Sequence, residues 1–393
     1  MFFYRLLIIH TITMDIMIKI SRILVGVIIL FITSICFAAG DIPELYKACT
    51  YIITAGINST DKIARIESLR LVPGLNDKSQ VSKLKNLLQS DIDDGTIIQV
   101  VAGLNKFGDS SQNQLLSDII KKRGIITQEM KPIERARVLM RDNVRANAVK
   151  AVGDIGDKTF VPLLKKLSND AAENGRVRDQ AMISQAKLGD RESSIKMFMF
   201  GMDSIDTNIR RQSCIAMGEL KESSALPKLV EQLSYFDKEI KSVAAISIGK
   251  IGEKKIAPYI KELLSNKEPS VQISGCDALG MLGDANYIPQ LKEMINNENG
   301  TVKLAAAISL IKLGDFSEEN IMFQAFDSTD FDAKLKSAQA LTEYGKPGHL
   351  DKLGIVFNKE QNPTVKLNIA NAIVQICNRE KLIKSGKPGK KEK

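Results

Sequence analysis

The sequence comprises 393 residues, of which 44% are hydrophobic and 5% aromatic, with no tryptophan. This length allows either two ordinary domains or one extended array, and the abundance of Ala, Ile, Leu and Lys favours helices packed through aliphatic side chains. The formal net charge is +9, but the last ten residues alone contribute five lysines and one glutamate. The rest of the chain is nearly balanced, which argues against a nucleic-acid-binding domain, because such domains concentrate basic residues on the folded body.

Residues 1–38 have the organisation of a secretory signal peptide. Lys19 and Arg22 precede an apolar run at 23–35, and the small-residue stretch CFAAG follows. The apolar run is short for a membrane-spanning helix, which needs about 20 residues. We therefore predict an exported protein, periplasmic or extracellular, that is cleaved after Ala38.

Two points about this segment stay open. The stretch before Met14 is unusual for a signal peptide, so Met14 and Met17 are alternative starts. A lipoprotein modified at Cys36 and an uncleaved membrane anchor are alternatives to cleavage, although Ile35 is bulkier than the residue that normally precedes a lipidated cysteine.

The remaining chain divides into four segments. Residues 40–123 are predicted to form a helical segment with divergent repeats, and residues 141–383 to form the main repeat array. Between them, residues 124–140 (GIITQEMKPIERARVLM) exceed one repeat period and predict an insertion or a kink. Residues 384–393 (KSGKPGKKEK) are expected to be a disordered basic tail, with attraction to an anionic membrane surface as the alternative.

Glycines recur at a fixed interval within the array. A glycine-rich stretch such as GCDALGMLGD could by itself be a phosphate-binding loop. A glycine that returns in unit after unit instead indicates a structural corner between two helices. Four corners are spaced by 31 residues, namely Gly252, Gly283, Gly314 and Gly345. Earlier units carry Lys221, Gly189 and Gly156 at the same place, and Gly108 and Gly74 in two divergent copies.

Each corner lies between two helical patterns. The first helix opens with a branched apolar residue that is usually followed by a cation or an amide, as in Val177-Arg178, Ile209-Arg210 and Val271-Gln272. The second helix follows an acidic residue and has proline near its start, which suits a helix N-terminus. Residues three positions before the branched one are predicted to cap the first helix: Asp206, Asp237, Asn299, Asp330 and Asn362.

The pattern V-R-x-x-A-x-x-A-L-G-x-L-G-D with a period near 31 resembles the HEAT-like repeats of the short, lyase-type subclass. Residues 177–190 and 271–284 match it best, and the resemblance extends over about 141–380. One helical hairpin cannot cover its own apolar face, so neighbouring hairpins stack. The resemblance therefore implies an all-α fold, an α-solenoid of stacked HEAT-like hairpins, that acts as a binding scaffold.

Four cysteines follow the predicted signal peptide, and two of them occupy one repeat position. Cys214 and Cys276 are two units apart, which places their sulfurs roughly 20 Å from each other in a stack of helices. A disulfide needs Cα atoms within about 7 Å. We therefore predict that both are free, buried thiols.

Candidates for catalysis are few. The sequence contains only two histidines, His10 and His349, and we expect His349 to be a surface residue at a junction between a loop and a helix. HEAT-like enzymes such as the deoxyhypusine hydroxylases depend on several His-Glu pairs, which this sequence lacks. We predict no catalytic residue, no metal and no cofactor, and interpret Asp330 as a cap instead of a calcium ligand.

Two surfaces are candidates for partner binding. In the second helices, equal register places two rows on one face: Lys228, Tyr259 and Gln290, and, three residues on, Glu231, Glu262 and Glu293. We expect both rows to point outward, and the resemblance implies that second helices line the concave side of the solenoid. The rows could be plain solvated residues or an acidic groove with Tyr259 as an anchor.

The second candidate is KMFMFGM at 196–202, where Met197 and Phe200 belong to an unusually apolar second helix. It is either core or an adaptable surface for a partner.

The sequence thus favours a non-catalytic, exported scaffold that binds a protein or peptide. An accessory or maturation factor of an enzyme, and an envelope-surface binder that uses the basic tail, are the alternatives. The pattern specifies neither the partner nor the oligomeric state.

Overall fold

The computed structural model describes residues 41–90 and 92–383, and all regular elements among them are helices. The predicted all-α class is therefore confirmed. These residues form two compact units, one from residues up to 71 together with those from 345 onward, the other from 72–344. The predicted signal peptide and basic tail lie outside the described residues. No described helix combines the length and the apolar character that a membrane span requires.

The first unit joins the two ends of the described chain. It contains α2 (Ile42–Ala55), α3 (Lys62–Leu71), α20 (Leu350–Lys359) and α21 (Pro363–Arg379), with short 3-10 turns η2 (Gly56–Asn58) and η9 (Pro347–His349). Helix α21 packs against α2, α3 and α20 and is buried along most of its length. His349 is buried here, 4% exposed, and its Nδ1 accepts a hydrogen bond from the Lys346 N–H at 2.9 Å. The expected surface position of His349 was wrong, because the imidazole caps the turn that begins the next helix.

The second unit is a stack of helical hairpins. It begins with η3 (Val72–Leu75), α4 (Gln80–Leu87), α5 (Asp94–Lys106) and α6 (Gln114–Lys121). First helices of the repeats are α7 (Pro132–Ile155), α9 (Gly175–Lys187), α11 (Thr207–Glu219), α13 (Lys238–Ile251), α15 (Pro269–Leu282), α17 (Gly300–Lys312) and α19 (Phe331–Tyr344). Second helices are α8 (Val161–Asn169), α10 (Glu192–Gly201), α12 (Leu226–Gln232), α14 (Ala257–Lys261), α16 (Ile288–Met294) and α18 (Asn320–Ala325).

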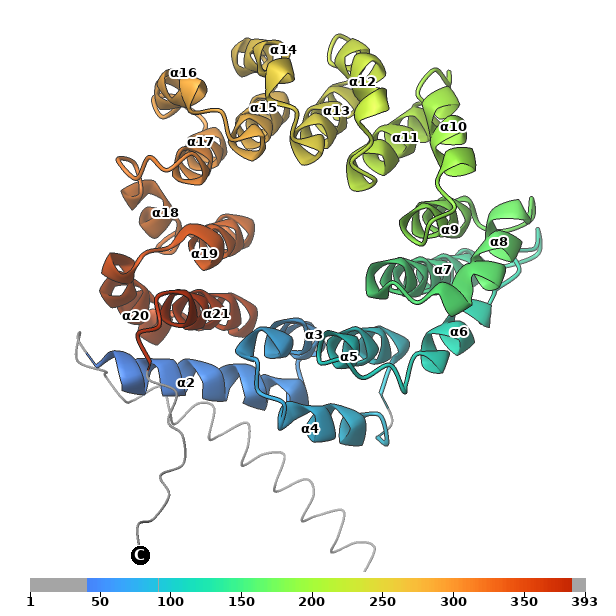
Figure 1. The fold of residues 1–393 in the computed structure, drawn as a ribbon, viewed down its shortest axis with the longest axis horizontal. Coiled ribbons are helices and arrows are strands. Elements are labelled where there is room, and N and C mark those ends of the chain that lie inside the picture. The colour runs from blue at the N-terminus through green and yellow to red at the C-terminus, as the bar shows by residue number, and fades with distance from the viewer. Residues whose placement is uncertain (1–40, 91, 384–393) are drawn as a thin grey trace, which may run out of the picture. The chain divides into compact units, whose positions relative to one another are not determined.

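Short 3-10 turns adjoin several second helices, namely η4 (Lys158–Phe160), η5 (Ser223–Ala225), η6 (Lys254–Ile256), η7 (Glu262–Ser265) and η8 (Ala285–Tyr287). From α7 to α17 the first helices form an inner layer and the second helices an outer one (Figure 1). The predicted insertion at 124–140 corresponds to a loop and the opening turns of the 24-residue helix α7.

The corners and caps follow the repeat. Most corner glycines have a positive φ, for example 84° at Gly252 and 67° at Gly283, and Lys221 takes the same conformation with a φ of 49°. The corners at the two ends of the repeat series differ from this conformation. Gly345 has no positive φ, and near Gly74 the left-handed residue is Asn76. The predicted caps accept backbone hydrogen bonds as expected: Asp206, Asp237, Asn299, Asp330 and Asn362.

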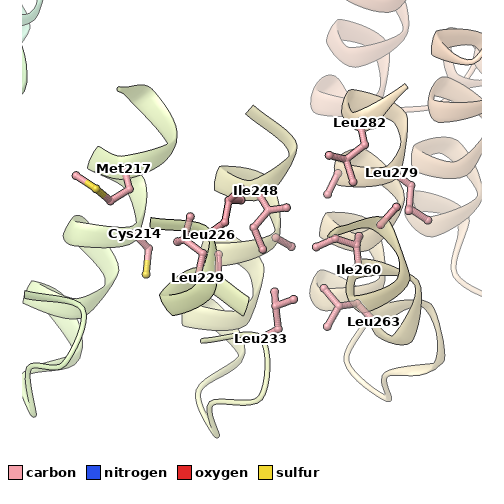
Figure 2. Close-up of a cluster of buried hydrophobic side chains, with 14 of the residues drawn as sticks. Cys214, Met217, Leu226, Leu229, Leu233, Ile248, Ile260, Leu263, Leu279 and Leu282 are labelled. Carbon is pink, nitrogen blue, oxygen red and sulfur yellow. The ribbon is translucent and has the colours of Figure 1, made fainter. Parts of the chain in front are cut away.

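The core of this unit lies between the two layers. Figure 2 shows side chains of α11, α12, α13 and α15 meeting there, among them Leu226, Leu229, Ile248 and Leu279. Cys214 is part of this cluster, and both Cys214 and Cys276 are fully buried free thiols, as predicted. Burial raises the pKa of each thiol to about 12, so neither is a reactive thiolate.

Candidate functional site: a groove between α9 and α11

Glycines on the first helices bring neighbouring repeats close together. They stand three residues before the corner, at Gly153, Gly218, Gly249 and Gly280, and each faces a small residue of the next first helix. A Cβ added at these positions would lie only 2.7–3.0 Å from the Cα of Ser184, Ser247, Ala278 or Ser309, respectively. The backbones therefore pack closely because a side chain is missing, which explains why the first helices form the inner layer.

The stack is interrupted between α9 and α11. In α9 the corresponding position is Ala186 instead of glycine. Helices α9 and α11 touch far less than α7 and α9 or α11 and α13 do (Figure 1). Helix α10 contacts α11, as the other second helices contact the first helix that follows them, with Gly201 against Ser213. Ala186 thus adds a Cβ at the position where a glycine allows the closest approach between other first helices.

A groove of 1440 Å³ opens at this interruption. Side chains from α9, from the end of α10 and from the start of α11 contribute its lining. Three of the apolar lining residues are exposed to solvent: Met197 (40%), Phe200 (79%) and Ile209 (51%). The structure thus brings the two residues that the sequence singled out in KMFMFGM, Met197 and Phe200, together with Ile209 of the next helix. Phe198 of the same motif is buried and contributes to the core.

Most charged residues of the groove have a partner of opposite charge. Arg211 donates to Glu239 at 2.6 Å, and Lys150 lies 3.6 Å from Glu219. Lys238 pairs with Glu268, and Asp203 accepts from Lys228. Because these charges are already paired, the charged side chains of α9 are the ones in the groove that are available to a ligand.

Helix α9 presents Arg176, Asp179 and Gln180 to the groove on one face, because they are three and four residues apart. The Gln180 side-chain nitrogen is buried and has no hydrogen-bond partner among the described residues. Burial raises the pKa of Asp179, an effect that the Arg178 guanidinium opposes. A buried donor without an acceptor and a desolvated carboxyl both reduce stability, and such groups gather at binding sites.

A buried ion network fixes the loop before α9. The Arg145 guanidinium, 2% exposed, donates to Asp142 at 2.8 Å and to both carboxylate oxygens of Glu173 at 2.9 and 2.7 Å. Its Nε donates to the Ile120 carbonyl at 2.7 Å. Glu173 precedes Asn174, the cap of α9, so the network positions this wall of the groove. The sequence did not reveal this network, because Ile120 and Glu173 lie outside α7.

The two predicted rows lie on the outer layer, on or next to α12, α14 and α16. Their glutamates Glu231, Glu262 and Glu293 are exposed, as is Tyr259 at 54%, so they point outward as expected. Lys228 instead binds Asp203 and the Met199 carbonyl, and Gln290 is partly buried. The expectation that second helices line the concave side was wrong, since the first helices form the inner layer (Figure 1).

Residues 41–90 and 92–383 contain no group of three or more His, Cys, Asp or Glu side chains that could hold a metal ion.

Comparison with known proteins identifies the repeat. Residues 226–311 match the family model of HEAT repeats, which confirms the predicted resemblance in this region. No curated protein matches the sequence.

Several solved structures are similar to the chain. The complex of CpcE and CpcF of phycocyanin lyase from Nostoc is 17% identical over 55% of this chain and 94% of that chain, with a TM-score of 0.41. Human deoxyhypusine hydroxylase is 15% identical over 70% and 97%, with a TM-score of 0.32. The karyopherin Kap121p is 12% identical over 86% and 43%, with a TM-score of 0.35.

Proposed function

Given HEAT repeats at residues 226–311, we propose that this protein is a non-catalytic scaffold that binds a protein or peptide segment in the groove between α9 and α11. The observation that carries the proposal is the solvent exposure of Met197, Phe200 and Ile209 around one groove. Apolar side chains that gather at one place on a surface are a typical feature of binding sites.

The chemistry of the lining suits a polypeptide ligand. Phe200 offers a large aromatic surface, and aromatic residues dominate the energetics of many interfaces. Met197 has a flexible, polarisable side chain that adapts to ligands of different shape. The groove lies where two closely packed parts of the stack meet, so it can receive a side chain without the displacement of a core residue.

Loss of the Phe200 ring is expected to weaken binding strongly. Peptides selected from a phage-displayed random library on the immobilised protein should bind Phe200→Ser at least about 30-fold more weakly than wild type, because removal of an interface aromatic costs about 2 kcal/mol or more. Fluorescence anisotropy with the synthetic peptides measures this difference.

Phe236→Ser is the matched control, since Phe236 is 81% exposed but does not line the groove. It should bind the selected peptides like wild type, and both variants should melt like wild type. Selected peptides that bind Phe200→Ser as tightly as wild type, or a selection without enrichment, would contradict the proposal.

Export of the protein, inferred from residues 1–38, is likewise a proposal. The N-terminal mass of the protein recovered from the envelope or medium tests it: an N-terminus at Ala39 supports export with cleavage, an intact N-terminus contradicts cleavage after Ala38, and absence of the protein from both fractions contradicts export.

A further inference from the structure

Helix α9 forms one wall of the groove. Some side-chain N–H groups on this wall have no hydrogen-bond acceptor within the described residues. Arg176 is exposed, and the one hydrogen bond that its side chain makes within the described residues goes to the Asn143 side chain at 2.9 Å. Gln180, one turn further along the same face, has a buried side-chain nitrogen with no acceptor in this part of the chain. Together they offer N–H groups to an acceptor that enters the groove.

The remaining charges do not provide that acceptor. The carboxylates of Glu219 and Glu239 already face Lys150 and Arg211, respectively, and Asp203 is paired with Lys228. Asp179 lies next to Arg178, whose positive charge favours the ionised form of this carboxyl. Arg176 and Arg178 are therefore lining cations whose charges no carboxylate of the described residues balances within 4 Å, and Arg176 is the more exposed of the two.

The opposite wall carries the exposed apolar residues of the groove. Its exposed apolar residues are Met197 and Phe200 at the end of α10 and Ile209 at the start of α11, and polar residues such as Asn208 and Gln212 adjoin them. A ligand that spans the groove thus meets hydrogen-bond donors and a positive charge on one side, and aliphatic and aromatic surface on the other.

We propose that the segment bound in this groove is acidic and apolar, with a Glu or Asp carboxylate on Arg176 and Gln180 and an aliphatic or aromatic side chain against Phe200. This inference rests on the proposed peptide-binding function and specifies its ligand. Charge complementarity at an exposed arginine contributes more to selectivity than to total affinity.

The probes are three fluorescein-labelled peptides of twelve residues built from Leu and Phe, with Glu, Gln or Lys at every third position. Wild-type protein should bind the Glu peptide about fivefold more tightly than the Gln peptide, as expected for a partly solvated ion pair, and the Lys peptide most weakly. The preference for Glu over Gln should decline as the salt concentration rises.

Two substitutions are expected to have opposite effects on the preference for the Glu peptide. Arg176→Gln should remove the preference for the Glu peptide, and Asp179→Asn should increase it, because the first removes a complementary charge and the second a like charge. Neither should change binding of the Gln peptide. Arg141→Gln, on the exposed face of α7 and outside the groove lining, is the control that should behave like wild type.

The outcomes separate this inference from the proposed function. Equal binding of the Glu and Gln peptides, or a preference for Lys, together with dependence on Phe200, would overturn the ligand class alone. No binding by any of the three peptides would count against both.

Discussion

Replacement of Arg145 by alanine is expected to destabilise the protein by about 3–5 kcal/mol, the range observed when one partner of a buried ion pair is removed. The carboxylates of Asp142 and Glu173 would stay buried without their counter-ion, and the Ile120 carbonyl would lose its donor. Urea unfolding of the variant and wild type measures the difference. Arg141→Ala, on the exposed side of the same helix, should change stability by less than about 0.5 kcal/mol.

The effect should depend on pH in a defined direction. Burial by itself raises the pKa of Glu173, but hydrogen bonds from Arg145 and from the Asn174 N–H lower it below the ordinary value. A lowered pKa in the folded state stabilises the protein above the pKa of the unfolded chain, and this contribution is lost as the pH falls through the folded value. Without Arg145, burial dominates, so the difference between wild type and Arg145→Ala should shrink on acidification. A constant difference between neutral and acidic pH would show that Glu173 does not depend on Arg145.

Gly218→Ala should also destabilise the protein, by about 1–3 kcal/mol, as overpacking of a closely packed contact does. The new Cβ would lie 2.7 Å from the Cα of Ser247, so α11 and α13 would have to separate. Gly300→Ala is the matched control, because Gly300 is also helical and its Cβ would meet open space. There the substitution should be neutral or slightly stabilising. Thermal melts of both variants test the prediction, and equal stability would contradict the account of the inner layer.

The repeat could be predicted from the sequence because each repeat forms its cap, corner and core with residues that are close together in the chain. A capping residue such as Asp237, a corner such as Gly252 and a small core residue such as Cys276 act over a few residues, and the structure places them as predicted. At the ends of the repeat series these turns and burial patterns differ. Near Gly74 the turn moves to Asn76, and His349 becomes buried because its ring accepts a backbone hydrogen bond.

The packing of the inner layer and the groove between α9 and α11 depend on contacts between neighbouring repeats. The glycines Gly218, Gly249 and Gly280 also recur at 31 residues, so their spacing was visible, as was the alanine at 186. Their significance was not, because it requires knowledge of which helices face each other. The same limitation applies to Arg145, whose partner Glu173 is 28 residues away. Met197 and Phe200 could be singled out because they replace the polar positions of an otherwise regular second helix.

Hydrogen–deuterium exchange of the protein with and without a bound peptide tests the central claim most directly. If the groove between α9 and α11 is the binding site, the peptide should protect amides in α9, α10 and α11 and leave α12, α14 and α16 unchanged. Protection on α12, α14 and α16, around Glu231, Tyr259 and Glu293, with no change in α9 to α11, would contradict this account and place the binding surface on the outer layer.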